Sequence, residues 1–192
     1  MSAAGRTWWG FHRLTEPVAR QLVRTAGIGP GDLVLDIGAG DGVVTEALVR
    51  AGARVVAVEL HPSRVRTLRR RFAEAPVTIV QADGADLWLP RRPFRVVANP
   101  PFGITTALLR RLLHPGSRLV SADVVVPLPL AVRWAAGRAP GAGRWAWVFD
   151  ARVVRRLPPG AFRPPPRSPT AVLRLERHRA GGADPNAPPV AA

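Results

Sequence analysis

The sequence predicts an α/β protein whose mostly parallel, doubly wound sheet carries helices on both faces. Apolar runs of strand length alternate with segments of helical spacing from residue 32 onward. The runs are continuously apolar, which is typical of strands buried on both faces. A chain of 192 residues, 47% of them hydrophobic, can bury the core of one medium-sized domain, so one domain of this class is expected.

The first half of the chain supplies the parallel part of the sheet. Proline and glycine mark helix boundaries, with Pro62 near a helix start and Gly52 just past a helix end. The predicted strands cover residues 32–38, 53–60, 77–83 and 94–100. The predicted helices between and after them cover residues 43–52, 62–75 and 104–116.

The second half adds a fifth strand at 118–127 and a helix at 128–138. Two further strands, at 144–157 and 170–178, flank a proline-rich segment. Strands joined by a loop of this length can pair antiparallel, so we expect the two at one edge of the sheet.

Composition points to a polyanionic partner. The 28 basic residues are all arginine and outnumber the 13 acidic ones, which gives a formal net charge of +15. Arginine pairs with phosphates and stacks on bases, so nucleic acid is the expected partner. Cysteine is absent, no paired histidines occur, and no run of about 18 apolar residues or apolar leader is present. We therefore expect a cytoplasmic protein with no metal site and no membrane association.

A glycine-rich turn joins the first strand to the first helix. The segment "VLDIGAGDG" places Gly38, Gly40 and Gly42 there, where a backbone without side chains can approach a ligand beside a helix N-terminus. Val43 stands where the dinucleotide fingerprint has its third glycine, which disfavours a pyrophosphate cofactor such as NAD. Taken alone, the turn is equally explained as a tight connection.

Two carboxylates end the next two strands. Glu59 is placed to accept hydrogen bonds from a ribose diol, and Asp83 can accept one from the exocyclic amine of adenine. Their neighbours Leu60 and Gly84, and Asn99 at the end of the fourth strand, belong to the same predicted cofactor site. Three ligand positions at successive strand ends suit S-adenosylmethionine as the cofactor.

The fourth strand ends in "NPPF", residues 99–102. An adenine N6 amine is a poor nucleophile because its lone pair is delocalised into the ring. The Asn99 side-chain oxygen and the Pro100 carbonyl can accept its hydrogens and favour the tetrahedral nitrogen that attacks a methyl sulfonium. Phe102 offers a ring on which a flipped base can stack. The alternative is a capped turn with Phe102 in the core.

With these motifs, the sequence resembles the rRNA adenine N6-methyltransferases of the KsgA/Erm superfamily, over about residues 10–176, and the Erm group more closely than the KsgA group. Near its other end, "FRPPPRSPTAVLRL" resembles the family's F-x-P-x-P segment, with Phe162, Pro164 and Pro166 in register. The family's opening motif corresponds to "FHRL", in which His12 and Leu14 match. The resemblance implies that these two residues contact the cofactor.

The resemblance also implies a Rossmann-like class I S-adenosylmethionine-dependent methyltransferase with a seven-stranded sheet. The sequence resembles the short Erm-type forms that lack the helical C-terminal domain. This resemblance implies N6 methylation of an adenine in the macrolide-binding region of 23S rRNA. That modification confers resistance to macrolides, lincosamides and streptogramin B. The expected organisation is an N-terminal arm (1–15), a catalytic domain (16–178) and a disordered tail (179–192), acting as a monomer on 23S rRNA or its precursor particle.

Arginines and tryptophans supply candidate RNA contacts, because together they pair with phosphates and stack on unpaired bases. The alternative is that the tryptophans anchor the N-terminus and the arginines are solvated, as we expect for those at 64–71. The predicted RNA-binding residues are Arg6, Trp8, Trp9, Arg133, Arg152, Arg155, Arg156, Arg163 and Arg167.

Two other functions stay open at this point. The same four-residue motif serves N-methyltransferases that act on small-subunit rRNA, DNA adenine or a protein glutamine amide. From a different class, the chain could be an RNA-binding assembly factor that has lost activity on a methyltransferase fold.

Overall fold

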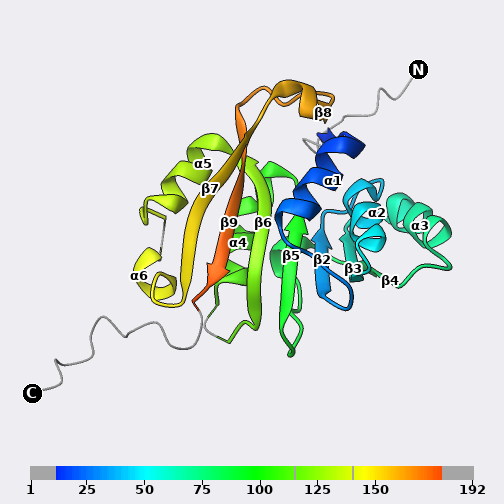
Figure 1. The fold of residues 1–192 in the computed structure, drawn as a ribbon, viewed down its shortest axis with the longest axis horizontal. Coiled ribbons are helices and arrows are strands. Elements are labelled where there is room, and N and C mark those ends of the chain that lie inside the picture. The colour runs from blue at the N-terminus through cyan, green and yellow to red at the C-terminus, as the bar shows by residue number, and fades with distance from the viewer. Residues whose placement is uncertain (1–11, 115, 140, 179–192) are drawn as a thin grey trace, which may run out of the picture.

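The computed structural model describes residues 12–114, 116–139 and 141–178, and it contains the predicted mostly parallel sheet (Figure 1). Seven strands lie in the order β4-β3-β2-β5-β6-β9-β7. The first five strands in this order, β4, β3, β2, β5 and β6, pair in parallel with their neighbours, whereas β9 runs antiparallel to both β6 and β7. The strands are β2 (Leu33–Ile37), β3 (Arg54–Glu59), β4 (Val77–Gln81), β5 (Phe94–Ala98), β6 (Leu119–Pro127), β7 (Phe149–Leu157) and β9 (Thr170–Arg177).

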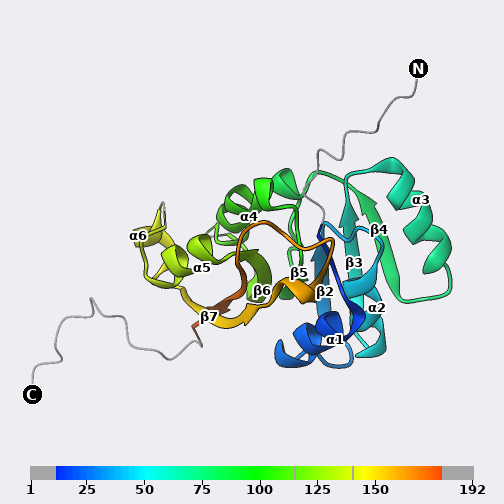
Figure 2. The same ribbon diagram turned by 90° about the horizontal axis from the view of Figure 1, so that it is seen from above.

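Helices cover both faces of this sheet, because successive residues of each strand point to opposite sides. Val34 packs into a cluster with α1 and α2, while the adjacent Leu35 packs into a second cluster with α4 and α5. Figure 2 shows these two pairs of helices on opposite sides of the sheet. The helices are α1 (Glu16–Thr25), α2 (Val43–Arg50), α3 (Pro62–Arg71), α4 (Thr105–Leu112), α5 (Leu128–Ala135) and α6 (Ala142–Trp145). Single 3-10 turns lie at η1 (Gly84–Asp86), η2 (Phe102–Ile104) and η3 (Pro159–Ala161).

A second, two-stranded sheet joins the two ends of the described chain. Strand β1 (Arg13–Leu14) pairs antiparallel with β8 (Phe162–Arg163). Leu14 and Phe162 lie opposite each other and are both buried in the cluster beneath α1 and α2. The segment before α1 is therefore fixed to the proline-rich segment between β7 and β9.

The prediction of an antiparallel edge pair is confirmed, with β7 as the edge strand. The predicted start of that strand is wrong: residues 142–145 are helical and the strand begins at Phe149. Trp145 is buried and stacks on Trp134 of α5, with ring centroids 5.3 Å apart. The apolar alternation around Trp145 thus reflects packing against a helix and not a strand.

Helix α1 lies before residue 32, where the first element predicted from the sequence begins. Its polar first turn contains Glu16 and a proline, and its buried residues Ala19, Leu22 and Val23 recur at helical spacing. None of the helices in the described ranges is long and apolar enough to cross a membrane.

Candidate active site

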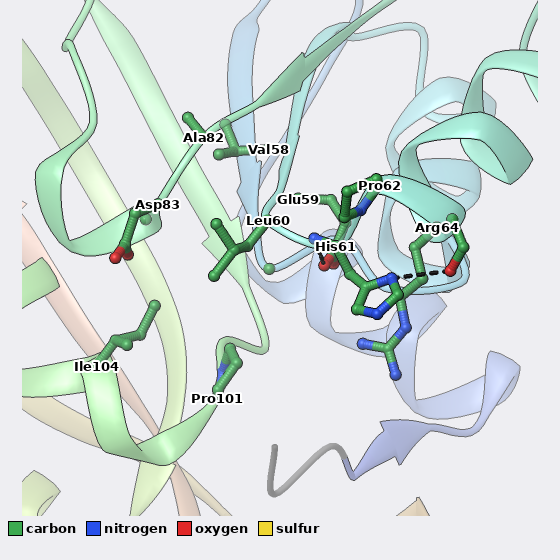
Figure 3. A pocket seen from close by; sticks show the side chains of 13 residues that line it. Val58, Glu59, Leu60, His61, Pro62, Arg64, Ala82, Asp83, Pro101 and Ile104 are labelled. Atoms are coloured by element: carbon green, nitrogen blue, oxygen red, sulfur yellow. Dashed lines mark hydrogen bonds between the residues drawn. The ribbon is translucent and has the colours of Figure 1, made fainter. Parts of the chain in front are cut away.

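Four strand ends bring the predicted ligand residues together. Gly38, Glu59, Asp83 and Asn99 follow or end β2, β3, β4 and β5, and the carboxyl ends of parallel strands meet at one edge of the sheet. A cavity of about 450 Å³ opens there (Figure 3). The predicted cofactor residues among its lining are Gly38, Glu59, Leu60, Asp83 and Gly84.

Glu59 is held rigidly at this cavity. It is 6% exposed, and its two carboxylate oxygens accept hydrogen bonds from the backbone N–H groups of Gly40 (2.8 Å) and His61 (2.9 Å). Each oxygen keeps a second lone pair that can accept from a hydroxyl group. The carboxylate therefore fits a ribose diol, and Gly40 supports it from behind without lining the cavity.

The opposite part of the cavity is an apolar slot with a polar end. Gly84 is buried so tightly that an added Cβ would lie 2.6 Å from Ile37 Cγ2 and 3.1 Å from Ile104 Cδ1. Asp83 is exposed, and its Oδ1 accepts from the backbone N–H of Ala85 at 2.8 Å. A flat purine fits against Gly84 and Ile104, and its exocyclic amine can donate to the Asp83 carboxylate. Ile104, missed by the sequence reasoning, carries no signal beyond following the "NPPF" motif.

Gly38 joins the cofactor loop to the "NPPF" segment. Its φ is +76°, and an added Cβ would lie 3.0 Å from Pro101 Cδ and 3.1 Å from Pro100 Cα. Gly42 has a different role: its missing side chain makes room for Phe72 and Leu68 of the α3 region, at 2.7 and 2.8 Å from an added Cβ. The loop thus touches the cavity through Gly38 and packs on α3 through Gly42.

Gly38→Ala is expected to weaken cofactor binding and slow methyl transfer together, by roughly 10-fold or more, because strain at a positive φ costs about 1–3 kcal/mol and the methyl group also displaces Pro100. Isothermal titration with S-adenosylmethionine and a transfer assay would measure both. Gly103→Ala, which meets nothing within 4 Å, is the matched control. Equal behaviour of the two variants would contradict the proposed packing.

Asn99 presents an unused acceptor. Its Nδ2 donates to the backbone carbonyl of His12 at 2.7 Å, and this contact fixes the amide orientation because a carbonyl cannot donate. Its Oδ1 is buried and has no hydrogen-bond partner among the described residues. A buried polar atom without a partner is costly unless a ligand satisfies it. A hydrogen-bond donor, such as an amine N–H, would satisfy this oxygen.

His12 connects Asn99 to the F-x-P-x-P segment. Its Nδ1 donates to the carbonyl of Pro164 at 3.0 Å, and its ring centroid lies 5.7 Å from that of the half-buried Phe102. Leu14 is 1% exposed and anchors β1 in the core. Neither His12 nor Leu14 lines the 450 Å³ cavity, whereas Leu14 and Asn99 border a small neighbouring cleft that Gly38 shares.

Asp36 is a buried carboxyl beneath the cofactor loop. It is 1% exposed, and its Oδ2 accepts from the Thr45 hydroxyl at 2.6 Å. Burial raises the pKa of Asp36 from 3.8 to about 7, against the lowering effect of the Thr45 hydrogen bonds and with a further raising effect from Glu59.

The raised pKa predicts a pH-dependent stability. The folded state holds the Asp36 proton more tightly than the unfolded chain, so the free energy of unfolding falls as pH rises from about 4 to about 7. Asp36→Asn lacks this loss, so it is expected to be more stable than the parent at pH 8, by up to roughly 4 kcal/mol, and to lose that advantage near pH 4. Urea unfolding of both proteins across this range measures the difference, and a constant difference would contradict the prediction.

The predicted RNA-binding arginines are spread over several elements. Arg152 pairs with Glu176 at 2.9 Å, and Arg133 and Arg163 donate to backbone carbonyls. Arg155 and Arg156 lie opposite Val172 and Ala171, which belong to clusters on opposite faces of the sheet. Arg167 is exposed in the proline-rich segment, while Arg6, Trp8 and Trp9 lie outside the described residues.

The sequence analysis expects the arginines at 64–71 to be solvated, and the structure agrees for only some of them. Arg64 lines the cavity (Figure 3), and Arg71 pairs with Glu46 and donates to the backbone carbonyl of Asp41 in the cofactor loop at 2.5 Å. Arg69 is exposed, in agreement with the prediction. Helix α3 reaches the sheet edge with its first turn, which the sequence pattern alone did not indicate.

The chain is similar to curated proteins over most of its length. A curated relative, ribosomal RNA small subunit methyltransferase A of Synechococcus sp. (strain JA-3-3Ab), is 36% identical over 185 residues, which are 88% of this chain and 66% of that protein. Mycinamicin-resistance protein MyrB of Micromonospora griseorubida is 39% identical over 156 residues, which are 77% of this chain and 47% of that protein. The chain therefore spans about half to two thirds of the length of these relatives.

Solved structures of methyltransferases share the fold of this chain. The 23S rRNA methyltransferase ErmE superposes with a TM-score of 0.76 at 28% identity, covering 88% of this chain and 70% of that one. A dimethyladenosine transferase from Plasmodium falciparum superposes with a TM-score of 0.74 at 20% identity, which shows the shared fold; it covers 87% of this chain and 64% of that one. The predicted class I methyltransferase fold is confirmed.

A family model described as "Ribosomal RNA adenine dimethylase" matches residues 3–185. It confirms the predicted superfamily and the predicted cofactor, S-adenosylmethionine, for which the residues around the cavity fit the ribose and the adenine. The relatives carry names from both the small-subunit and the resistance branches. The comparisons therefore show the family as a whole, and not the Erm group that the sequence analysis predicts. The chain belongs to the ribosomal RNA adenine dimethylase family.

Proposed function

We propose that this protein transfers a methyl group from S-adenosylmethionine to the N6 amine of an adenine in 23S rRNA. The observation that carries the proposal is the buried Asn99 Oδ1, an acceptor without a partner at the end of β5. In family members, an adenine amine offers the hydrogens that such an acceptor needs. Asn99 lies beside the cavity that fits the cofactor, and this position supports methyl transfer from the cofactor to the adenine amine.

The residues of this chain act mainly by positioning. Bound S-adenosylmethionine supplies an electrophilic methyl group on a sulfonium. Asn99 Oδ1 and the Pro100 carbonyl accept the two N6 hydrogens, which localises the nitrogen lone pair toward the methyl carbon. A cofactor held by Gly38, Glu59 and Asp83 would supply the methyl group and keep the electron pair of its C–S bond on sulfur, and the methylated amine would then release one proton to solvent. Phe102 and its neighbour His12 offer ring faces for the extruded base.

The choice of 23S rRNA is supported by relatives in the resistance branch. MyrB is a mycinamicin-resistance protein, 39% identical, and ErmE is a 23S rRNA methyltransferase with 28% identity. We propose resistance to macrolides, lincosamides and streptogramin B as the consequence. We also propose that the enzyme acts as a cytoplasmic monomer, on 23S rRNA or its precursor particle, through a catalytic domain at 16–178 and an N-terminal arm at 1–15 that carries further RNA contacts at Arg6, Trp8 and Trp9.

Small-subunit rRNA is the second candidate substrate. The relatives named as small-subunit methyltransferases match over more of this chain, 88% for the one from Synechococcus sp. (strain JA-3-3Ab) against 77% for MyrB. The catalytic motif serves both targets equally, because both present an adenine N6 amine.

One experiment separates the two. The protein is incubated with labelled cofactor and with purified 23S or 16S rRNA, and the modified base is mapped by mass spectrometry. Label in one adenine of 23S rRNA is the expected result. Label confined to 16S rRNA establishes the second candidate, and no label in either RNA, together with no cofactor binding by calorimetry, would favour an inactive assembly factor.

A further inference from the structure

A second cavity lies at the edge of the sheet opposite the active site. Its volume is about 440 Å³, and it opens where β5 and β6 begin and β9 ends, at the lower end of the sheet in Figure 1. Strand β6 has nine residues, so roughly 30 Å separate the two edges at about 3.3 Å per residue. The lining consists of Pro93, Gly116, Ser117, Arg118, Val120 and Arg177.

Arg177 is fixed in this cavity by neutral groups. Its Nε and Nη2 donate to the carbonyls of Leu119 and Ser117, both at 2.7 Å, and its guanidinium lies 4.5 Å from the ring centroid of Phe149. Carbonyls and a ring hold the side chain without neutralising its charge. Its Nη1 donates to no group among the described residues, so a preorganised cationic donor remains available.

Arg118 adds a second charge to the same cavity. It is exposed and forms no ion pair within the described ranges. Partial burial and, second, the positive charge of Arg118 lower the pKa of the Arg177 guanidinium, so the two arginines are close enough to repel each other.

Two further arginines lie next to the cavity along the chain. The backbone N–H of Phe94 donates to the carbonyl of Arg118 at 3.3 Å, and Arg91 and Arg92 directly precede Pro93, which lines the cavity. Both are exposed and, in the part of the chain that the structure describes, unpaired. The acids adjacent in sequence to Arg177 and Phe149 are already engaged elsewhere: Glu176 pairs with Arg152 at 2.9 Å, and Asp150 lies 3.1 Å from His178.

We propose that this cavity and its rim, defined by Arg91, Arg92, Arg118 and Arg177, bind a backbone phosphate of the RNA substrate at a point distant from the target adenine. The inference rests on the proposed function, in that RNA is the substrate. Guanidinium groups suit phosphate because their planar donors match its oxygens. A contact roughly 30 Å from the methyl-transfer site selects a large folded RNA over a short one.

Arg118→Gln tests the proposal, because this side chain is exposed and holds no other residue in place. Binding is measured by fluorescence anisotropy on a long 23S rRNA fragment and on a short stem-loop containing the target adenine. The variant is expected to bind the long fragment about 5- to 10-fold more weakly, with a slope of log affinity against log salt reduced by about one, and to bind the stem-loop normally. Methyl transfer at saturating RNA should be unchanged.

Arg69→Gln is the matched control, since it removes the same charge from an exposed position on α3. Equal losses in the two variants, or an equal loss on the stem-loop, would overturn the proposal. The failure of the proposed function is recognised separately: wild-type protein that binds the long fragment through Arg118 without methylating it would leave the phosphate site standing and remove the enzymatic assignment.

Discussion

Asn99→Ala is expected to lower the rate of methyl transfer by about 100- to 1000-fold, the effect of removing one group that stabilises a transition state. The substitution removes Oδ1, the buried acceptor that lacks a partner, and also the Nδ2 donor to His12. Cofactor affinity should change little, because Asn99 does not line the 450 Å³ cavity. Single-turnover transfer and calorimetry measure the two quantities on the same preparations.

Asn99→Asp separates the two roles of the amide. It keeps acceptor oxygens but replaces the donor to the His12 carbonyl with a repelling oxygen, so partial activity would assign part of the effect to positioning. Gln21→Ala removes an amide from α1 and serves as the control. Wild-type rates for Asn99→Ala would eliminate the proposed mechanism.

Glu59→Ala is expected to weaken S-adenosylmethionine binding by about 100-fold or more. Two charge-assisted hydrogen bonds to a ribose diol are worth about 1.5–3 kcal/mol each, and about 1.4 kcal/mol corresponds to a factor of ten. The substitution also releases the backbone N–H groups of Gly40 and His61, which loosens the cofactor loop. Titration calorimetry gives the affinity, and circular dichroism confirms that the variant is folded.

Glu59→Gln and a surface control sharpen this test. Glutamine has one acceptor oxygen where Glu59 uses two, so it can satisfy only one of the two backbone N–H groups and should bind the cofactor with intermediate affinity. Glu74→Gln removes a charge from an exposed position outside the cavity and should behave as the parent. Parent-like affinity in Glu59→Ala would show that the cofactor lies elsewhere.

The strand ends were predictable from sequence because their chemistry is local. Apolar runs, a glycine turn, Glu59 and Asp83 follow one another at the spacing of a parallel sheet, and the structure lines one cavity with Gly38 and both acids. The antiparallel edge pair was predictable for the same reason, since a proline-rich loop separates two apolar segments.

Contacts between distant segments were not predictable in this way. The hydrogen bond from His12 to Pro164 joins residues 152 positions apart, and no periodicity reports such a pairing. Trp145 misled the strand assignment because alternating apolar residues fit either a strand or a helix end that packs on Trp134. The separate roles of Gly38 and Gly42 depend on which side chains approach them, Pro101 in one case and Phe72 in the other.

The link from Asn99 through His12 to Pro164 has a consequence for the chain during its synthesis. A ribosome completes the cofactor loop, Glu59, Asp83 and Asn99 before it adds Pro164. Until then, the segment at residue 12 has neither its β8 partner nor the carbonyl that holds the His12 ring. The contacts that support the Asn99 amide can therefore form only after translation has passed the proline-rich segment.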